Sequence, residues 1–208
     1  AGGVTLSGVT LTSGSQFQAL NNTTTTLAGT FTNQGVFTEN SFGNNTTVLI
    51  DSAGVTLTGG GVYSLSNSPV NYLYGQNGST TLTNLDNTIQ GSGQLGSNQL
   101  QLDNRRLIVA NQTTPLTIDP SGTGVTNTGT LRATNGATLQ LTSGTFTNTG
   151  GLIEAQTGSL VDLSSATISG GNLTAVGTGL LRSLGGVTFS GVTLTAGSEL
   201  QALNNTTT

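Results

Sequence analysis

The opening stretch of this chain, positions 1–25, recurs almost unchanged at positions 184–208, and this recurrence constrains the fold more than any other feature. The two copies are identical at 20 positions, and the exchanges include Leu6 for Phe189 and Phe17 for Leu200. A self-match of this length predicts a tandem array, with residues 1–183 as one unit and 184–208 as the start of the next.

The composition favours β-structure throughout. Threonine is the most frequent residue, glycine occurs 32 times, and only 6% of the chain is charged. Short runs of Thr, Val, Ile and Leu alternate with polar residues and are broken by Gly and Asn, as in "ATLQL" at 137–141. Alternation of this kind is typical of half-buried strands that end in turns. The sequence therefore predicts an all-β protein.

A shorter period lies within the unit 1–183. Apolar residues stand at the centres of Thr-rich triplets at intervals of 18 to 26 positions, and a turn-forming residue stands four positions after each. The centres are Leu11, Phe31, Leu57, Leu82, Leu107, Val125, Phe146 and Ile168, and Leu194 begins the next unit. One strand and one corner per period predict a parallel β-solenoid of about eight coils per unit, continuous across the unit boundary.

Four asparagines share one place in this pattern, two residues after a triplet centre. They are Asn33, Asn84, Asn127 and Asn148. Stacked coils would place such side chains above one another, so they are candidates for a ladder of amide hydrogen bonds. The alternative is that each asparagine bonds its own backbone at the entry to a turn.

Two surface motifs are candidates for binding. In "NYLYG", Tyr72 and Tyr74 fall on the same face of a strand, where they could contact sugars, a neighbouring rod or only the protein itself. Thr-x-Thr triplets suggest outward threonine pairs of the kind that hold ice, although the varying coil length argues against a regular lattice. These triplets lie at 10–12, 30–32, 56–58, 81–83, 145–147 and 193–195.

The residue types exclude most catalytic and metal chemistry. The chain has no Cys, His or Lys, so Ser–His–Asp, Cys–His and Ser–Lys nucleophiles cannot form within it. Eight carboxylates remain, and only Asp86 and Asp103 could approach each other across a coil. We expect no enzyme activity and no catalytic, cofactor or metal site. Four arginines and a net charge of −4 do not suit nucleic acid, and no apolar run is long enough to span a membrane.

Several stretches resemble the repeats of very large bacterial secreted or surface proteins of the filamentous-haemagglutinin and autotransporter-passenger type. The resemblance is carried by "TNLDNTIQGSGQLGSNQLQL" (83–102), "VTNTGTLRATNGATLQL" (125–141) and "FTNTGGLIEAQTGSLVDL" (146–163). It implies a right-handed parallel β-solenoid, export from the cell, and a role as stalk, adhesin or extracellular fibre.

These observations lead to two functional hypotheses. The first is a structural protein, one unit of a long fibre at the cell surface or outside the cell, whose partners are the neighbouring units of the same array. The second is a binding module that presents Thr, Asn and Tyr rows to glycans or ice. Lateral association between rods is a further possible contact.

Overall fold

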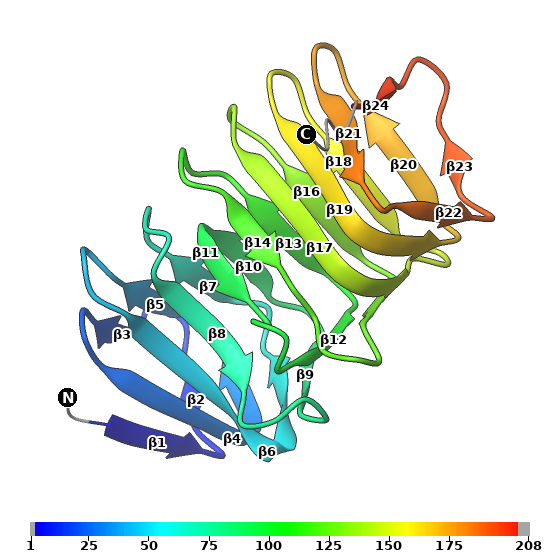
Figure 1. Cartoon of the computed structure of the whole chain (residues 1–208). Helices are drawn as coiled ribbons and strands as arrows, with labels where there is room; N and C mark the ends of the chain where they lie inside the picture. Colours follow the sequence, from blue (N-terminus) through cyan, green and yellow to red (C-terminus); the bar gives the residue numbers. More distant parts are fainter. Residues whose placement is uncertain (1–2, 204–208) are drawn as a thin grey trace.

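The computed structural model describes residues Gly3–Leu203, and within them every regular element is a β-strand. All strand pairs are parallel, and the chain winds from one end of the molecule to the other in about nine coils (Figure 1). The prediction of an all-β parallel solenoid is confirmed. Between Gly3 and Leu203 there is no helix that could cross a membrane.

Each coil has three sides, which we define by the strands that pair along them. Side 1 holds β1 (Gly3–Ser7), β8 (Asn71–Gly75), β11 (Gly93–Leu95), β14 (Leu116–Ile118), β21 (Leu180–Gly185) and β24 (Leu200–Ala202). Side 2 holds β2 (Thr10–Leu11), β9 (Thr81–Asn84), β12 (Gln101–Asn104), β15 (Val125–Asn127) and β22 (Thr188–Ser190).

Four longer strands run along side 1, turn the corner and continue along side 2. They are β4 (Thr24–Asn33), β6 (Thr46–Thr58), β17 (Thr138–Thr147) and β19 (Leu160–Ser169). Their corners carry glycine or serine with positive φ, such as Gly29 and Ser165. A residue in that conformation turns the chain without ending its pairing with the strands above and below.

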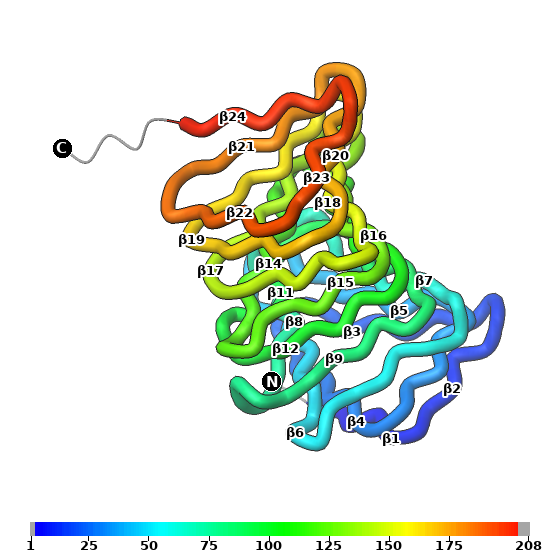
Figure 2. Tube along the Cα trace, turned by 90° about the vertical axis from the view of Figure 1, so that its right-hand side faces the viewer, coloured from blue at the N-terminus to red at the C-terminus, as the bar shows by residue number. Residues whose placement is uncertain are grey.

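Side 3 is a separate sheet with one strand from each coil. Its strands are β3 (Gln16–Leu20), β5 (Val36–Asn40), β7 (Val62–Leu65), β10 (Thr88–Gly91), β13 (Leu107–Ala110), β16 (Thr130–Ala133), β18 (Leu152–Ala155), β20 (Asn172–Ala175) and β23 (Thr193–Leu194). Figure 2 shows this succession of coils from the side. Because each coil supplies one strand here, the nine strands of this sheet correspond to nine coils.

Two of the triplet centres predicted from sequence lie on a different side from the rest. Leu82, Val125, Phe146 and Ile168 stack in one column on side 2, but Leu107 and Leu194 lie on side 3. The side-2 column contains Leu102 in place of Leu107. In "LDNRRLIV" (102–109), either Leu102 or Leu107 can be taken as the inward residue of the side-2 strand. The sequence pattern alone selects Leu107, which is wrong.

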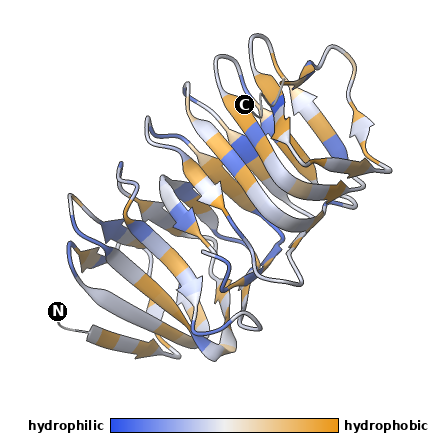
Figure 3. Cartoon of the chain, in the orientation of Figure 1, coloured by the Kyte–Doolittle hydropathy of each residue, from blue (hydrophilic) through white to orange (hydrophobic). Residues whose placement is uncertain are grey.

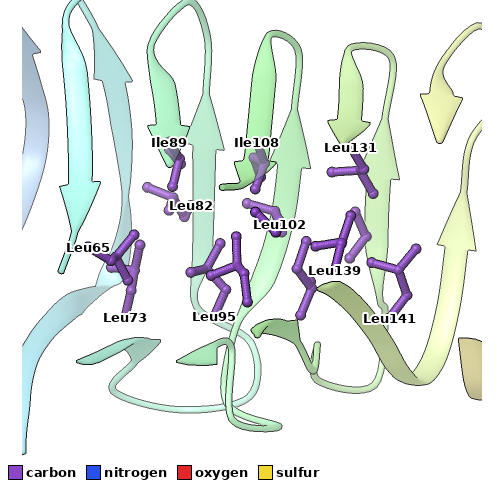
Figure 4. Close-up of a cluster of buried hydrophobic side chains, with 14 of the residues drawn as sticks. Leu65, Leu73, Leu82, Ile89, Leu95, Leu102, Ile108, Leu131, Leu139 and Leu141 are labelled. Atoms are coloured by element: carbon purple, nitrogen blue, oxygen red, sulfur yellow. The ribbon is translucent and has the colours of Figure 1, made fainter. Parts of the chain in front are cut away.

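The core is a set of apolar columns that run along the solenoid axis. Leu73, Leu95, Ile118, Leu141 and Leu163 succeed one another on side 1 and are almost fully buried. Figure 4 shows their neighbours from sides 2 and 3 pointing into the same interior, and Figure 3 shows the apolar residues alternating along the strands. Each inward side chain contacts its counterparts in the coils above and below, so no single coil needs a core of its own.

Candidate functional site

A ladder of four asparagines runs through the interior behind side 2. Asn84 donates from Nδ2 to Oδ1 of Asn104 (2.9 Å), Asn104 to Asn127 (2.7 Å), and Asn127 to Asn148 (2.6 Å). All four side chains are fully buried. Every amide in the middle of the ladder both donates and accepts, which offsets the cost of burying it.

The ladder coexists with bonds to the local backbone. Asn84 Oδ1 accepts from the Asn87 N–H (3.2 Å), and Asn127 Nδ2 donates to the Gly129 carbonyl oxygen (3.3 Å). The two interpretations of these asparagines are therefore compatible, because an amide has enough donors and acceptors for both. Each of these two asparagines fixes its own turn and is also bonded to the next coil.

Asn33 is not a rung of this ladder, contrary to the prediction. The register of Thr32 with Thr58 places Gly59 beside it in the next coil, and its amide passes that coil to reach Asn87 Oδ1 at 3.0 Å. In the same coil Leu57, not Gly59, is the register partner of Asn84, so Asn33 and the ladder lie in different columns. A Cβ on Gly59 would lie 2.6 Å from the Asn33 carbonyl oxygen, so only glycine leaves room.

Asn104 belongs to the ladder, although the predicted set does not contain it. It stands two residues after Leu102, which is the spacing of the other three rungs from their side-2 residues. Taking Leu107 as the centre of this coil hides the relation. With Leu102 as the centre, the same spacing rule finds all four rungs.

A second buried polar stack closes the corner between sides 3 and 1 in the earlier coils. Ser66 Oγ donates to the Ser41 carbonyl oxygen (2.9 Å), and Ser92 Oγ donates to that of Ser66 (2.7 Å). Asn71 Nδ2 donates to the carbonyl oxygens of Ser66 (2.8 Å) and Ser92 (3.2 Å). No periodic motif marks these residues, because serine is common in exposed turns as well.

One carboxyl group is buried in the core itself. Glu39 lies in β5, fully buried, and Tyr63 Oη donates to one of its oxygens while Oε2 has no partner. Tyr63 also stacks on Phe37 with ring centroids 4.8 Å apart, and Phe37 stacks on Phe17 at 4.9 Å. Burial raises the pKa of Glu39 to about 8, although hydrogen bonds from Tyr63 and the Tyr72 backbone lower it. Glu39 is therefore largely protonated at neutral pH.

Six of the other seven carboxylates have hydrogen-bond or ion-pair partners, whereas Oδ1 of Asp119 is buried without one. Arg182 donates two bonds of 2.7 Å to Asp162, Arg132 pairs with Glu154, and Arg105 with Asp103. The Gly60 N–H donates to Asp86 (3.0 Å), the Ala53 N–H to Asp51 (3.0 Å) and Gln201 Nε2 to Glu199 (2.7 Å). Burial raises the pKa of Asp119, and a hydrogen bond with Ser143 lowers it in part. Asp86 and Asp103 therefore each have separate partners.

Tyr72 and Tyr74 lie together on the outer surface of side 1. Their rings are nearly perpendicular, with centroids 6.4 Å apart, and both are half-buried. With Asn45, Thr47, Ser97 and Gln99 they line an open depression of about 310 Å³. A small ligand in this depression would therefore face two aromatic rings and several hydroxyl and amide groups.

Side 2 carries a row of outward hydroxyl groups. Its register passes from Thr30 through Thr56, Thr83, Asp103, Thr126, Thr147 and Ser169 to Ser190. Asp103 is the one interruption in this series. The corner loops absorb the changes in coil length, so the strands themselves stay in register.

The described residues Gly3–Leu203 include no cluster of three His, Cys, Asp or Glu side chains that could hold a metal ion. Comparisons with protein-family models, with curated proteins and with solved structures found no match. Any conclusion about function must therefore come from the geometry of this chain.

Proposed function

We propose that this protein is a structural unit of a long β-solenoid fibre or stalk, formed by tandem copies of the sequence 1–183. The observation that carries the proposal is the recurrence of residues 1–25 at 184–208 in a fold whose coils pair in parallel from β1 to β24. Each end of such a solenoid presents unpaired strands, which another coil of the same kind can continue.

The interior suits a mechanical role. The asparagine ladder, the serine stack and the strand pairing all join one coil to the next along the axis. The chain carries little charge and is rich in Thr, Ser and Asn, which suits a spacer that stays hydrated. We place the fibre outside the cell or on its surface because the chain resembles repeats of exported bacterial proteins, and a chain without cysteine is compatible with that location.

Small-angle X-ray scattering of a chain with three consecutive units tests this proposal. Eight coils at about 4.8 Å advance roughly 38 Å, so each added unit should lengthen the particle by about that amount at constant cross-section. The 208-residue chain is the control. Folded particles that become thicker instead of longer would rule out a fibre.

Binding is the second candidate function, and two surfaces favour it. The Tyr72–Tyr74 depression suits a sugar, and the in-register hydroxyl row of side 2 suits an ordered hydrated surface such as ice. A glycan array and an ice-recrystallisation assay test the two surfaces separately. Loss of glycan retention in Tyr72→Ser but not in Thr126→Val would assign binding to the depression, and the reverse pattern in the ice assay would assign it to side 2.

A further inference from the structure

The two copies of the recurring segment occupy different sides of the solenoid. In the first copy, β1, β2 and β3 lie on sides 1, 2 and 3. Their sequence equivalents in the second copy, β22, β23 and β24, lie on sides 2, 3 and 1. Each strand has therefore moved forward by one side. The described residues include 184–203 of this copy, while 204–208 lie outside them.

The register of side 3 gives the size of the offset. Phe17 and Leu194 lie in the same column, eight coils apart. The sequence equivalent of Phe17 is Leu200, which stands six positions beyond Leu194. These six positions take the chain around one corner, from side 3 to side 1, where Leu200 pairs with Leu181. The sequence repeat is therefore longer than eight whole coils by one side.

Both copies keep the same side chains toward the core in spite of this move. Leu6, Val9 and Phe17 pack against the core at one end of the solenoid, and their equivalents Phe189, Val192 and Leu200 do so at the other. Since these three positions face the core in both copies, the segment can stack on either of two successive sides. The sequence does not need a whole number of coils per unit in order to repeat.

We propose that each unit contains eight coils and one further side, so that successive units are turned by about one third of a revolution about the fibre axis. The open edges of β22, β23 and β24 would then be continued by the rest of the second copy, one side out of phase with the first. Three units would contain 25 coils and restore the phase. This inference rests on the proposed fibre, because it describes how the fibre's units join.

The offset has a consequence for the surface. The hydroxyl row on side 2 of one unit would continue on side 3 in the next, and the Tyr72–Tyr74 depression would move from side 1 to side 2. The fibre would present each surface in three directions around its axis. It would not form one flat threonine face longer than a single unit.

Disulfide trapping in the existing 208-residue chain tests the phase directly, because the chain has no cysteine of its own. Arg182 and Gln201 are register partners on side 1, and Thr174 and Thr195 are outward neighbours on side 3 with hydroxyl oxygens 3.0 Å apart. If the second copy occupied the same sides as the first, Gln201 would stack on Thr174 instead, because its equivalent Gln18 lies in that column.

We expect R182C/Q201C and T174C/T195C to form disulfides under mild oxidation and T174C/Q201C to remain reduced, since bridged cysteines need Cα atoms about 4.4–6.8 Å apart. Closure of T174C/Q201C without R182C/Q201C would overturn the offset and leave the fibre intact. Failure of all three pairs in folded protein would also overturn it, because the last copy would then not stack on β20 and β21. The scattering measurement on three units decides the fibre separately.

Discussion

The asparagine ladder of the middle coils and Glu39 of the early coils differ in how fully their buried polar atoms are hydrogen-bonded. In the middle coils, the asparagines from Asn84 to Asn148 are joined in a ladder in which each inner rung is both donor and acceptor. In the early coils, Glu39 lies beside the stacked rings of Phe37 and Tyr63 with one oxygen unpartnered. A repeated polar residue finds its partner in the next coil, whereas a single one depends on whatever side chain lies nearby. The comparison predicts that the early coils are the pH-sensitive part of the molecule.

The largest expected effect is the pH dependence due to Glu39. Its pKa is about 8 in the folded chain and near its ordinary value of 4.5 when unfolded. Between these values the unfolded state has already lost the proton that the folded state keeps, so stability falls as pH rises. The loss should approach about 4 kcal/mol by pH 8 and be absent below pH 4.5.

Urea unfolding of wild type and Glu39→Gln from pH 4 to pH 9 measures this effect. The glutamine variant cannot ionise, so its stability should be nearly flat over the range in which wild type declines. A wild-type curve parallel to that of the variant would show that Glu39 is ionised in the fold, and the contrast between the two regions would be lost.

A break in the ladder is expected to have the next largest effect. Asn127→Leu removes the acceptor of Asn104 and the donor to Asn148, and it leaves buried polar atoms unpaired. The loss should be about 3 kcal/mol in the free energy of unfolding. Asn172→Ala is the matched control, because Asn172 is exposed and the loss of its side chain should cost less than about 0.5 kcal/mol. Equal losses in the two variants would mean that the ladder contributes no stability.

A third prediction compares a largely buried ion pair with an exposed one. Arg182→Ala leaves Asp162, whose side chain is 7% exposed, without its two bonds and should cost about 2 kcal/mol. Arg105→Ala, at an exposed pair, should not change stability measurably. Both are read from urea midpoints at low and at high salt, and only the loss in Arg182→Ala should persist at high salt.

The smallest effect is expected at the tyrosine depression. Tyr72→Ser and Tyr74→Ser remove half-buried rings from an outer surface and should lower stability by no more than about 1 kcal/mol. Thermal unfolding followed by circular dichroism measures this. A loss as large as that of Asn127→Leu would make the pair part of the packing and weaken the case for a binding surface.

The sequence predicts the fold far better than it predicts the register. Alternation and turn residues recur along the chain, so the solenoid and its approximate coil number follow from them. Asn33 and Asn104 show the limit of this reasoning. The spacing rule includes Asn33 in the ladder, although its register partner is a glycine. It omits Asn104, because the pattern selects Leu107 as the centre of that coil in place of Leu102. Glu39 carries no sequence signal of burial beyond its place in an alternating strand. Its environment depends on which side chain of the next coil lies above it.

Cryo-electron microscopy of a three-unit chain tests the central claim most directly. The account predicts a thin rod whose strands lie across its long axis and follow one another at about 4.8 Å, with the asparagine ladder present in the interior of each unit. Particles in which the units fold as separate globules, or in which the strands run along the rod, would contradict it.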